Sequence, residues 1–251
     1  GSQNYIPENY HKYYTENLET FHALSLDYHP GQKTPISIIE KNNGNLIYCN
    51  SGVTSNWGGA IIELNYLSKE PSIIKYDSLD HIIDGFNGIY DPSQNLHYMV
   101  VNQIEKDQSG NIWVVNPYCE RYGHLLAIQS AGDNNWSHVS IPDSSSFRPQ
   151  TIDFDQSNRV WIGFAHDVIE DRVYSGGGMK ILSYSNISSG LWTDSSWVRI
   201  KNQGKLPGND STASVWSLIF DKMNFLWVMN EKGVRGYEYS INDNTITLDP
   251  I

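Results

Sequence analysis

The sequence predicts an all-β protein: a β-propeller of four-stranded antiparallel blades, with four blades recognisable. The main observation is a repeated phrase, which reads Ile104-Glu-Lys-Asp-Gln-Ser-Gly-Asn-Ile-Trp-Val-Val-Asn116 in its clearest copy. Two further copies follow it and a divergent one precedes it, so that the copies cover residues 38–50, 104–116, 152–163 and 218–230. Two more β-rich runs follow each copy, and no long segment has a helical period. Units of four strands stacked around an axis form a propeller.

Each copy of the phrase has the pattern of a β-hairpin, strands A and B of the unit. An apolar alternating run is followed by Asp, polar residues and Gly or Asn, and then by a second run that ends near Trp. An Asp side chain can bond its own backbone two residues on, and Gly or Asn tolerates positive φ. We therefore expect the aspartates to be turn residues and the tryptophans to pack between blades. These residues are Asp107, Asp155 and Asp221, and Trp113, Trp161 and Trp227.

Strands C and D follow each hairpin. A Gly precedes every third strand, as in Gly178-Met-Lys-Ile-Leu-Ser-Tyr184, and three of the four last strands are short apolar/polar alternations such as Thr245-Ile-Thr-Leu248. The spacing between copies varies, which indicates that insertions collect in loops while the strands hold the core. The predicted blades span about 35–77, 97–142, 149–202 and 213–250.

The number of blades leaves three alternatives open. The chain is part of a larger propeller, or four blades close alone, or two chains complete one ring as a homodimer. Open strand edges would favour aggregation. Residues 3–34 are predicted to be a leading segment, either a capping strand or the end of a preceding blade, and Gly1-Ser2 has the look of a cloning remnant.

Composition restricts the partners. The formal net charge of −11 argues against nucleic acid, since neutralising phosphates needs a basic face. No run of eighteen apolar residues exists, so no membrane span is predicted. The Asn-, Ser- and Tyr-rich surface favours a periplasmic, cell-surface or secreted protein. A Cys49–Cys119 disulfide and a pair of free thiols both remain open.

The phrase Asp107-x-x-Gly110-Asn-Ile-Trp113 resembles the core of the two-component regulator propeller repeat. Gly204-Lys-Leu-Pro-Gly-Asn209 is similar to that family's approach to strand A, and Lys232-Gly-Val-Arg-Gly-Tyr237 to its later Gly-Gly segment. The stretch from Tyr98 to Tyr118 resembles versions in secreted proteins of Bacteroidota-like bacteria, including the PorZ-like propellers of type IX secretion. The resemblance implies an extracytoplasmic sensing or docking domain. The chain departs from the family in having Ile47 for Trp and Asn158 for Gly.

A ligand site is expected where the B–C and D–A loops gather on one face of the propeller, at 50–59, 116–122 and 164–177 and at 77–97, 142–150 and 201–214. Aromatic rings beside carboxylates and Arg suit a sugar or peptide ligand. The candidate ligand-binding residues in these loops are Trp57, Tyr118, Glu120, Arg121, His166, Asp167, Glu170, Arg172 and Tyr174.

Catalysis is not expected. The spacing from Asp107 to Gly110 is one residue longer than the Asp box of sialidases, and no H-E-x-x-H or G-x-S-x-G motif occurs. No cofactor is predicted, and each turn offers too few carboxylates to favour a structural cation. The sequence thus predicts a non-catalytic docking module that binds a protein. The alternatives are a glycan- or small-ligand-sensing propeller and, third, a glycan-active enzyme.

Overall fold

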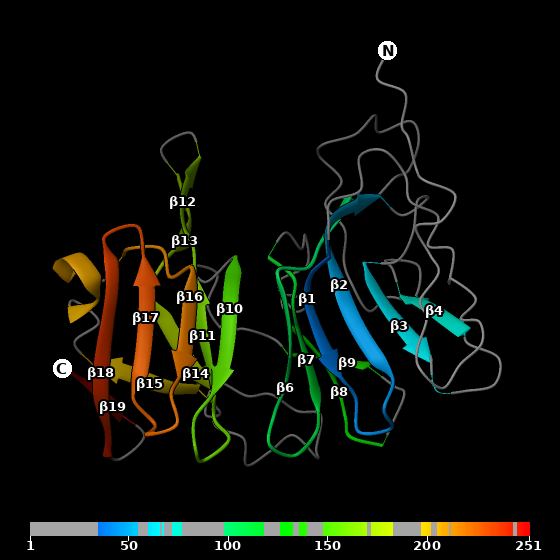
Figure 1. Cartoon of the computed structure of the whole chain (residues 1–251). Helices are drawn as coiled ribbons and strands as arrows, with labels where there is room; N and C mark the ends of the chain where they lie inside the picture. The colour runs from blue at the N-terminus through cyan, green and yellow to red at the C-terminus, as the bar shows by residue number, and fades with distance from the viewer. Residues whose placement is uncertain are drawn as a thin grey trace.

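The computed structural model describes residues 35–54, 60–65, 67, 72–76, 98–117, 126–132, 136–139, 148–169, 172–182, 197–201, 205–210, 212–242 and 245–251. These residues form strands, one short 3₁₀ turn at Pro207–Asn209 (η7), and no α-helix. No helix in this part of the chain is long and apolar enough to cross a membrane. The fold is a β-propeller, with four four-stranded antiparallel blades side by side in chain order (Figure 1).

The first two blades follow the predicted meander, each strand pairing with the next. The first blade consists of β1 (Pro35–Glu40), β2 (Leu46–Thr54), β3 (Ile61–Asn65) and β4 (Ser72–Tyr76). The second consists of β6 (Gln103–Lys106), β7 (Ile112–Val115), β8 (Leu126–Gln129) and β9 (Trp136–Val139).

The last two blades share an outer edge that the sequence pattern did not predict. The third blade consists of β10 (Pro149–Phe154), β11 (Val160–Phe164), β14 (Met179–Leu182) and β15 (Trp197–Lys201). The fourth consists of β16 (Ser217–Phe220), β17 (Leu226–Asn230), β18 (Gly233–Asn242) and β19 (Thr245–Pro250). The outer strands β15 and β19 pair in parallel, for example Ile200 with Ile246, so the two blades join into one eight-stranded sheet.

The turn aspartates are confirmed, and each also binds the tryptophan of its own hairpin. Asp155 Oδ1 accepts hydrogen bonds from the amides of Ser157 and Arg159 at 2.9 and 3.0 Å, and Oδ2 accepts one from Trp161 Nε1 at 3.0 Å. Asp107 and Asp221 make the equivalent bonds, to Trp113 Nε1 and Trp227 Nε1, both at 2.9 Å. A single carboxylate therefore both shapes the turn and fixes the indole on strand B.

Three hydrophobic clusters fill the spaces between neighbouring blades. Each blade has a forward face, turned toward the next blade in the chain, and a backward face, turned toward the preceding one. The clusters are centred on Ile47 between the first and second blades, Trp113 between the second and third, and Trp161 between the third and fourth. Both tryptophans are fully buried, which confirms their predicted packing role, whereas Trp227 is 37% exposed on the forward face of the fourth blade.

Two predicted loops are wrong in part, because they contain strands. In the segment 50–59, β2 continues to Thr54 and pairs with β5 (Tyr98–Val100), so Tyr98–Val100 extends the first blade rather than the second. In the segment 164–177, β12 (His166–Ile169) and β13 (Arg172–Gly176) form a separate hairpin. The leading segment 3–34 lies outside the described residues.

Candidate functional site

The hairpin β12–β13 rises from one face of the propeller, well clear of the blades (Figure 1). Its strands pair antiparallel from His166 opposite Gly176 to Ile169 opposite Arg172, with a register shift after Asp167. We call the side from which it rises the loop face. The Asp turns of the A–B hairpins lie on the opposite side, the turn face.

The base of this hairpin is anchored to the connection that leads into the fourth blade. The amide of His166 donates to Ser214 Oγ at 2.8 Å, and the amide of Gly178 donates to the Ala213 carbonyl at 3.0 Å. Gly177 has φ of 68°, and a Cβ there would collide with the Thr212 carbonyl oxygen, so only glycine fits. The hairpin is therefore held at its base by two adjacent blades.

The extension of β2 is the second strand structure on the loop face. Beyond the blade, Ser51 pairs with Val100 and Thr54 with Tyr98, with a register shift between Ser51 and Val53. Bulges of this kind bend a strand and change the direction in which it continues. Figure 1 shows this end of β2 turned away from the line of its blade.

The structure places four of the predicted site residues on the β12–β13 hairpin. These are His166, Asp167, Arg172 and Tyr174, and the side chain of His166 is exposed. The predicted residues Trp57, Tyr118, Glu120, Arg121 and Glu170 lie outside the described part of the chain, so a joint ligand site made by all nine stays a prediction.

Sequence reasoning missed Asp210, which lies at the base of the hairpin. Its Oδ1 accepts hydrogen bonds from the Thr212 hydroxyl and amide at 2.7 and 2.8 Å. These bonds lower the pKa of the Asp210 carboxyl, and the nearby Lys232 ammonium lowers it further. Its position in the 201–214 connection, which was expected on the loop face, is the feature of the sequence that could have identified Asp210.

A polar groove of about 590 Å³ runs along the first strands of the second, third and fourth blades. Side chains on the first strands of the first and second blades bind the backbone of the next blade. Ser37 Oγ donates to the Ile104 carbonyl at 2.9 Å and accepts from the Ile104 amide at 3.3 Å. Gln103, at the equivalent position one blade on, donates to the Ile152 carbonyl at 3.0 Å and accepts from its amide at 2.9 Å. These paired bonds, which we call the interblade clasps, fix the blades in register.

Two carboxylates face this groove at equivalent positions of adjacent blades. Burial raises the pKa of Glu105 and that of Asp153, and the charge of Asp153 adds to the effect on Glu105. Asp153 is already engaged, because its Oδ2 accepts from the Phe220 amide of the fourth blade at 2.6 Å and its Oδ1 from the Phe154 amide at 2.7 Å. Asp153 is thus part of the contact between the third and fourth blades.

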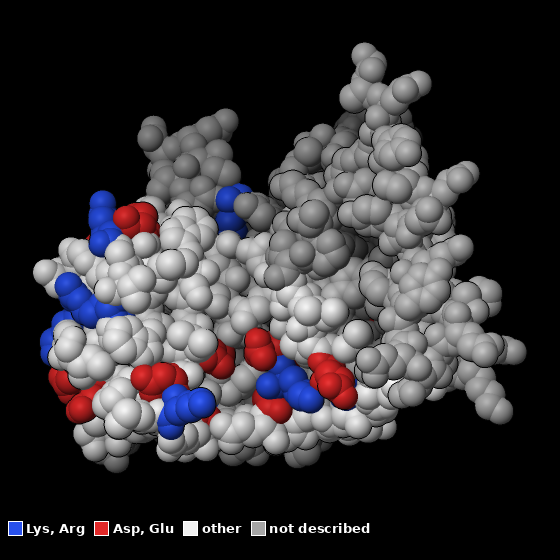
Figure 2. Space-filling view, in the orientation of Figure 1, with Lys and Arg blue, Asp and Glu red and all other residues white. Residues whose placement is uncertain are grey.

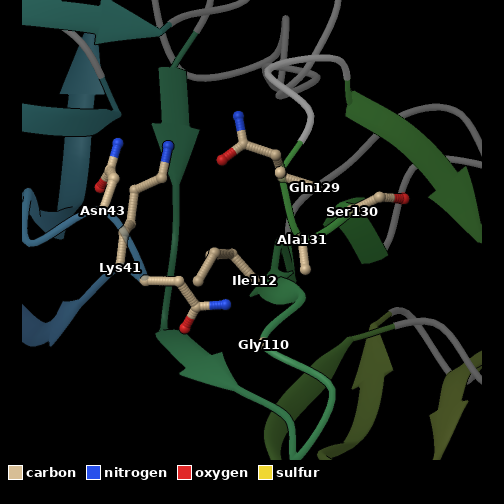
Figure 3. A pocket seen from close by; sticks show the side chains of 9 residues that line it. Lys41, Asn43, Gly110, Ile112, Gln129, Ser130 and Ala131 are labelled. Carbon is tan, nitrogen blue, oxygen red and sulfur yellow. The ribbon is translucent and has the colours of Figure 1, made fainter.

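A second pocket, of about 430 Å³, lies on the turn face between the first and second blades. Figure 3 shows Lys41 and Asn43 on its first-blade side, with Gln129 and Ser130 on the other. The Lys41 ammonium is paired with Glu63 at 2.9 Å, so the one charged group among the described residues that line this pocket is already bound. Among the residues that the structure describes, no three His, Cys, Asp or Glu gather to hold a metal ion. Cys49 is a free, buried thiol whose pKa burial raises to about 12, and Cys119 lies outside the described residues.

Comparison with known proteins identifies the fold and leaves the family open. No family model matches the chain, and no curated protein matches it by sequence. Among solved structures, the chain is similar to PorZ, a surface component of the type-IX secretion system of Porphyromonas gingivalis, at 14% identity and a TM-score of 0.51. The match covers 83% of this chain and 26% of PorZ, so the chain spans about a quarter of that protein's length.

Other similar structures include a lyase and the extracellular domain of a two component system. Virginiamycin B lyase from Staphylococcus aureus matches at 11% identity and a TM-score of 0.47, over 90% of this chain and 58% of the lyase. The extracellular domain of a protein named as a hybrid two component system of B. thetaiotaomicron matches at 15% identity and a TM-score of 0.39, over 89% and 30%. At these identities the likeness shows the propeller fold alone.

Proposed function

We propose that this chain is a non-catalytic protein-docking module of the bacterial cell surface or periplasm, and that its docking surface is the loop face. The observation that carries the proposal is the β12–β13 hairpin, which stands out from the blades and is anchored at its base by Ser214 and Ala213. Function in repeat scaffolds is concentrated in the loops that a rigid core holds in place. The similarity to a bacterial surface component of a secretion system supports the location.

The polar groups in the groove are already hydrogen-bonded between blades, which supports a docking function over a catalytic one. Asp153 accepts two backbone hydrogen bonds, and Gln103 bridges to Ile152, so these groups hold the blades together. A general acid or base must instead have a position open to the substrate. The loop face carries the extended strand edges that a protein partner can pair with.

The proposal is tested by capture from the cell envelope of the source bacterium. The chain is compared with a variant in which residues 166–176 are replaced by Asn-Gly, which can join Ala165 to Gly177 because the Gly177 amide lies 3.2 Å from the Ala165 carbonyl. The matched control is Lys222→Ala, which removes an exposed side chain from the turn face. Circular dichroism and thermal unfolding first establish that all three proteins fold.

We expect one envelope protein to be captured by the unaltered chain and by Lys222→Ala and to be lost with the hairpin-deleted variant. The purified captured protein should then bind directly in calorimetry. Capture that does not depend on the hairpin would contradict the loop face as the docking surface. Stabilisation of the chain by a saccharide in a thermal-shift panel would favour the glycan-sensing alternative, and turnover of a glycan would favour the enzyme.

A further inference from the structure

The forward face of the fourth blade is apolar and open to solvent. Its large apolar side chains are exposed to between 37% and 63%: Ile219, Trp227, Met229, Val234 and Ile251. Figure 2 shows a largely uncharged surface over β16 and β17, with charged groups around its edges. Repeat arrays normally end in units with polar outer faces, because an apolar end is poorly soluble.

Every inner blade buries the same positions against its neighbour. Trp113 and Trp161, equivalent to Trp227, are fully buried. Val234 pairs with Met229 across β17 and β18 just as Leu126 pairs with Val115 across β7 and β8. Leu126 and Val115 are both fully buried in the cluster between the second and third blades. The exposed face therefore has the composition and register of an interblade contact.

The polar groups of this face repeat the pattern as well. Ser217 occupies the position of Ser37, whose hydroxyl makes the clasp to the backbone of Ile104. On the turn face, the amides of Gln108 and Gln156 donate to the side-chain oxygen of an Asn in the next blade, at 3.0 and 3.1 Å. The fourth blade carries the equivalent amide at Lys222. A clasp serine and a turn amide thus flank the apolar patch.

The aromatic contacts indicate what fits against Trp227. Trp113 packs on Phe154 with ring centroids 6.0 Å apart, and Trp161 packs edge-on against Phe220 at 5.2 Å. In both cases the partner is the residue directly before the turn aspartate of the next blade. The first blade has Glu40 at this position, so the first blade of a second copy would set a carboxylate against the indole.

We propose that the forward face of the fourth blade is an interblade interface that takes the backward face of a further blade of this repeat. The first strand of that blade lies beside β16, where Ser217 clasps its backbone, and the aromatic residue before its turn packs on Trp227. This interface is separate from the loop face, so the proposed interface and the proposed docking function are tested independently of each other.

The test supplies such a blade. A copy of residues 140–201, which contains the third blade with its own preceding connection, is appended after Ile251. The readout is oxidation by hydrogen peroxide of Met229, which is 42% exposed, and of Met223, which is 74% exposed, followed on peptides by mass spectrometry. Met223 serves as the internal reference, because Ser109 and Ser157 at its position stay exposed in the inner blades.

We expect the appended blade to slow oxidation of Met229 about tenfold or more, while Met223 reacts as before. The matched control is the same chain with Ile152→Asp and Phe154→Asp in the appended copy only, which should leave Met229 reactive. Both substitutions fall on the backward face of the copy, whose original is buried against the second blade.

Three outcomes would overturn the proposal. The first is a folded appended blade, seen as added strand signal in circular dichroism, with Met229 as reactive as in the unextended chain. The second is concentration-dependent dimerisation of the unextended chain that protects Met229, which would make a second copy the occupant. The third outcome needs a second extended chain, in which a copy of residues 202–251 is appended and carries Met223→Leu and Met229→Leu. If neither appended copy folds, the proposal is contradicted. The original third and fourth blades fold against equivalent forward faces, so the Trp227 face would then differ from those faces.

Discussion

The first and third blades make the same A–B turn with different side chains. In the third blade, Asp155 accepts hydrogen bonds from two amides, from Arg159 Nε and from Trp161 Nε1. In the first blade, Lys41 and Ile47 stand at the positions of the Asp and the Trp, and Lys41 Nζ instead forms an ion pair with Glu63 on β3.

The backbone of the two turns is nevertheless the same. The Gly44 amide donates to the Lys41 carbonyl at 2.9 Å, and the Asn158 amide donates to the Asp155 carbonyl at 2.8 Å. Gly44 and Asn158 both have positive φ, of 84° and 59°. The backbone conformation thus depends on the residue with positive φ. The side-chain contact that holds the turn, which we call the fastening, differs between the blades: Asp with Trp in one and Lys with Glu in the other. The Asp and the Trp are replaced together, because an Asp without the indole would lose a hydrogen-bond donor.

The largest effect is expected from breaking the first blade's fastening at one end. Lys41→Met removes the ammonium from the buried Glu63 carboxylate, whose Oε1 also accepts a hydrogen bond from Asn45 Nδ2 at 2.6 Å. Loss of one member of a buried ion pair costs about 3–5 kcal/mol. Urea unfolding should report this loss, and Lys41→Met combined with Glu63→Leu should recover most of it. A single variant as stable as the unaltered chain would contradict a buried ion pair in this blade.

The third blade's fastening gives the next effect. Asp155→Ala leaves the fully buried Trp161 with an unpaired indole N–H and should destabilise by about 2–3 kcal/mol. Asp221→Ala is the matched control, since Trp227 is 37% exposed and water can replace the carboxylate, so a clearly smaller loss is expected. Equal losses for the two variants in urea unfolding would show that burial of the indole does not matter.

A smaller effect separates the left-handed residue from its hydrogen bond. Asn158→Ala places an alanine, which disfavours positive φ and has no polar side chain, at φ of 59°. It should lower the free energy of unfolding by about 1–2 kcal/mol. Asn158→Gly keeps the conformation and loses the acceptor for the Gln108 amide and the exposed donor to Ser109 Oγ, so about 1 kcal/mol or less is expected. A glycine variant less stable than the alanine variant in thermal unfolding would contradict this order.

The fold could be predicted because its signals are local. Asp, Gly or Asn at fixed offsets specify a turn whatever surrounds it, and the alternation of apolar residues around Trp161 specifies a strand with one buried face. The bond from Trp161 to Asp155 was missed because it joins two residues whose separate roles already explained the pattern. The register that brings them together exists only once the hairpin has formed.

The candidate site was less accessible to sequence reasoning. Segment 164–177 was expected to be a loop because it connects the predicted strands B and C of the third blade. Its residues Val168, Ile169 and Val173 are nevertheless β-branched and flank an acidic centre, as a hairpin requires. The exposure of Trp227 had no local signal either. Its neighbours in sequence match those of the buried tryptophans, and burial depends on whether another blade is present.

The smallest effect concerns the groove, where the first blade has Ile39 and the second has Glu105 at the same position. Since burial raises the pKa of Glu105 above its ordinary value of 4.5, the folded chain binds more protons than the unfolded chain in the pH window between the ordinary and the raised pKa. Folding stability attributable to this group therefore falls as pH rises through that window and is regained as pH falls.

Glu105→Gln removes the titration and keeps an acceptor for the Lys106 amide, which lies 3.3 Å from Glu105 Oε1. The variant should gain stability over the unaltered chain as pH rises through that window and lose the advantage as pH falls below about 4.5. Glu238→Gln, on exposed β18, should leave the profile unchanged. Parallel pH profiles for Glu105→Gln and the unaltered chain would mean that Glu105 is solvated like a surface carboxylate. Burying a carboxylate in the groove would then cost no stability, and the isoleucine of the first blade would bring no advantage at this position.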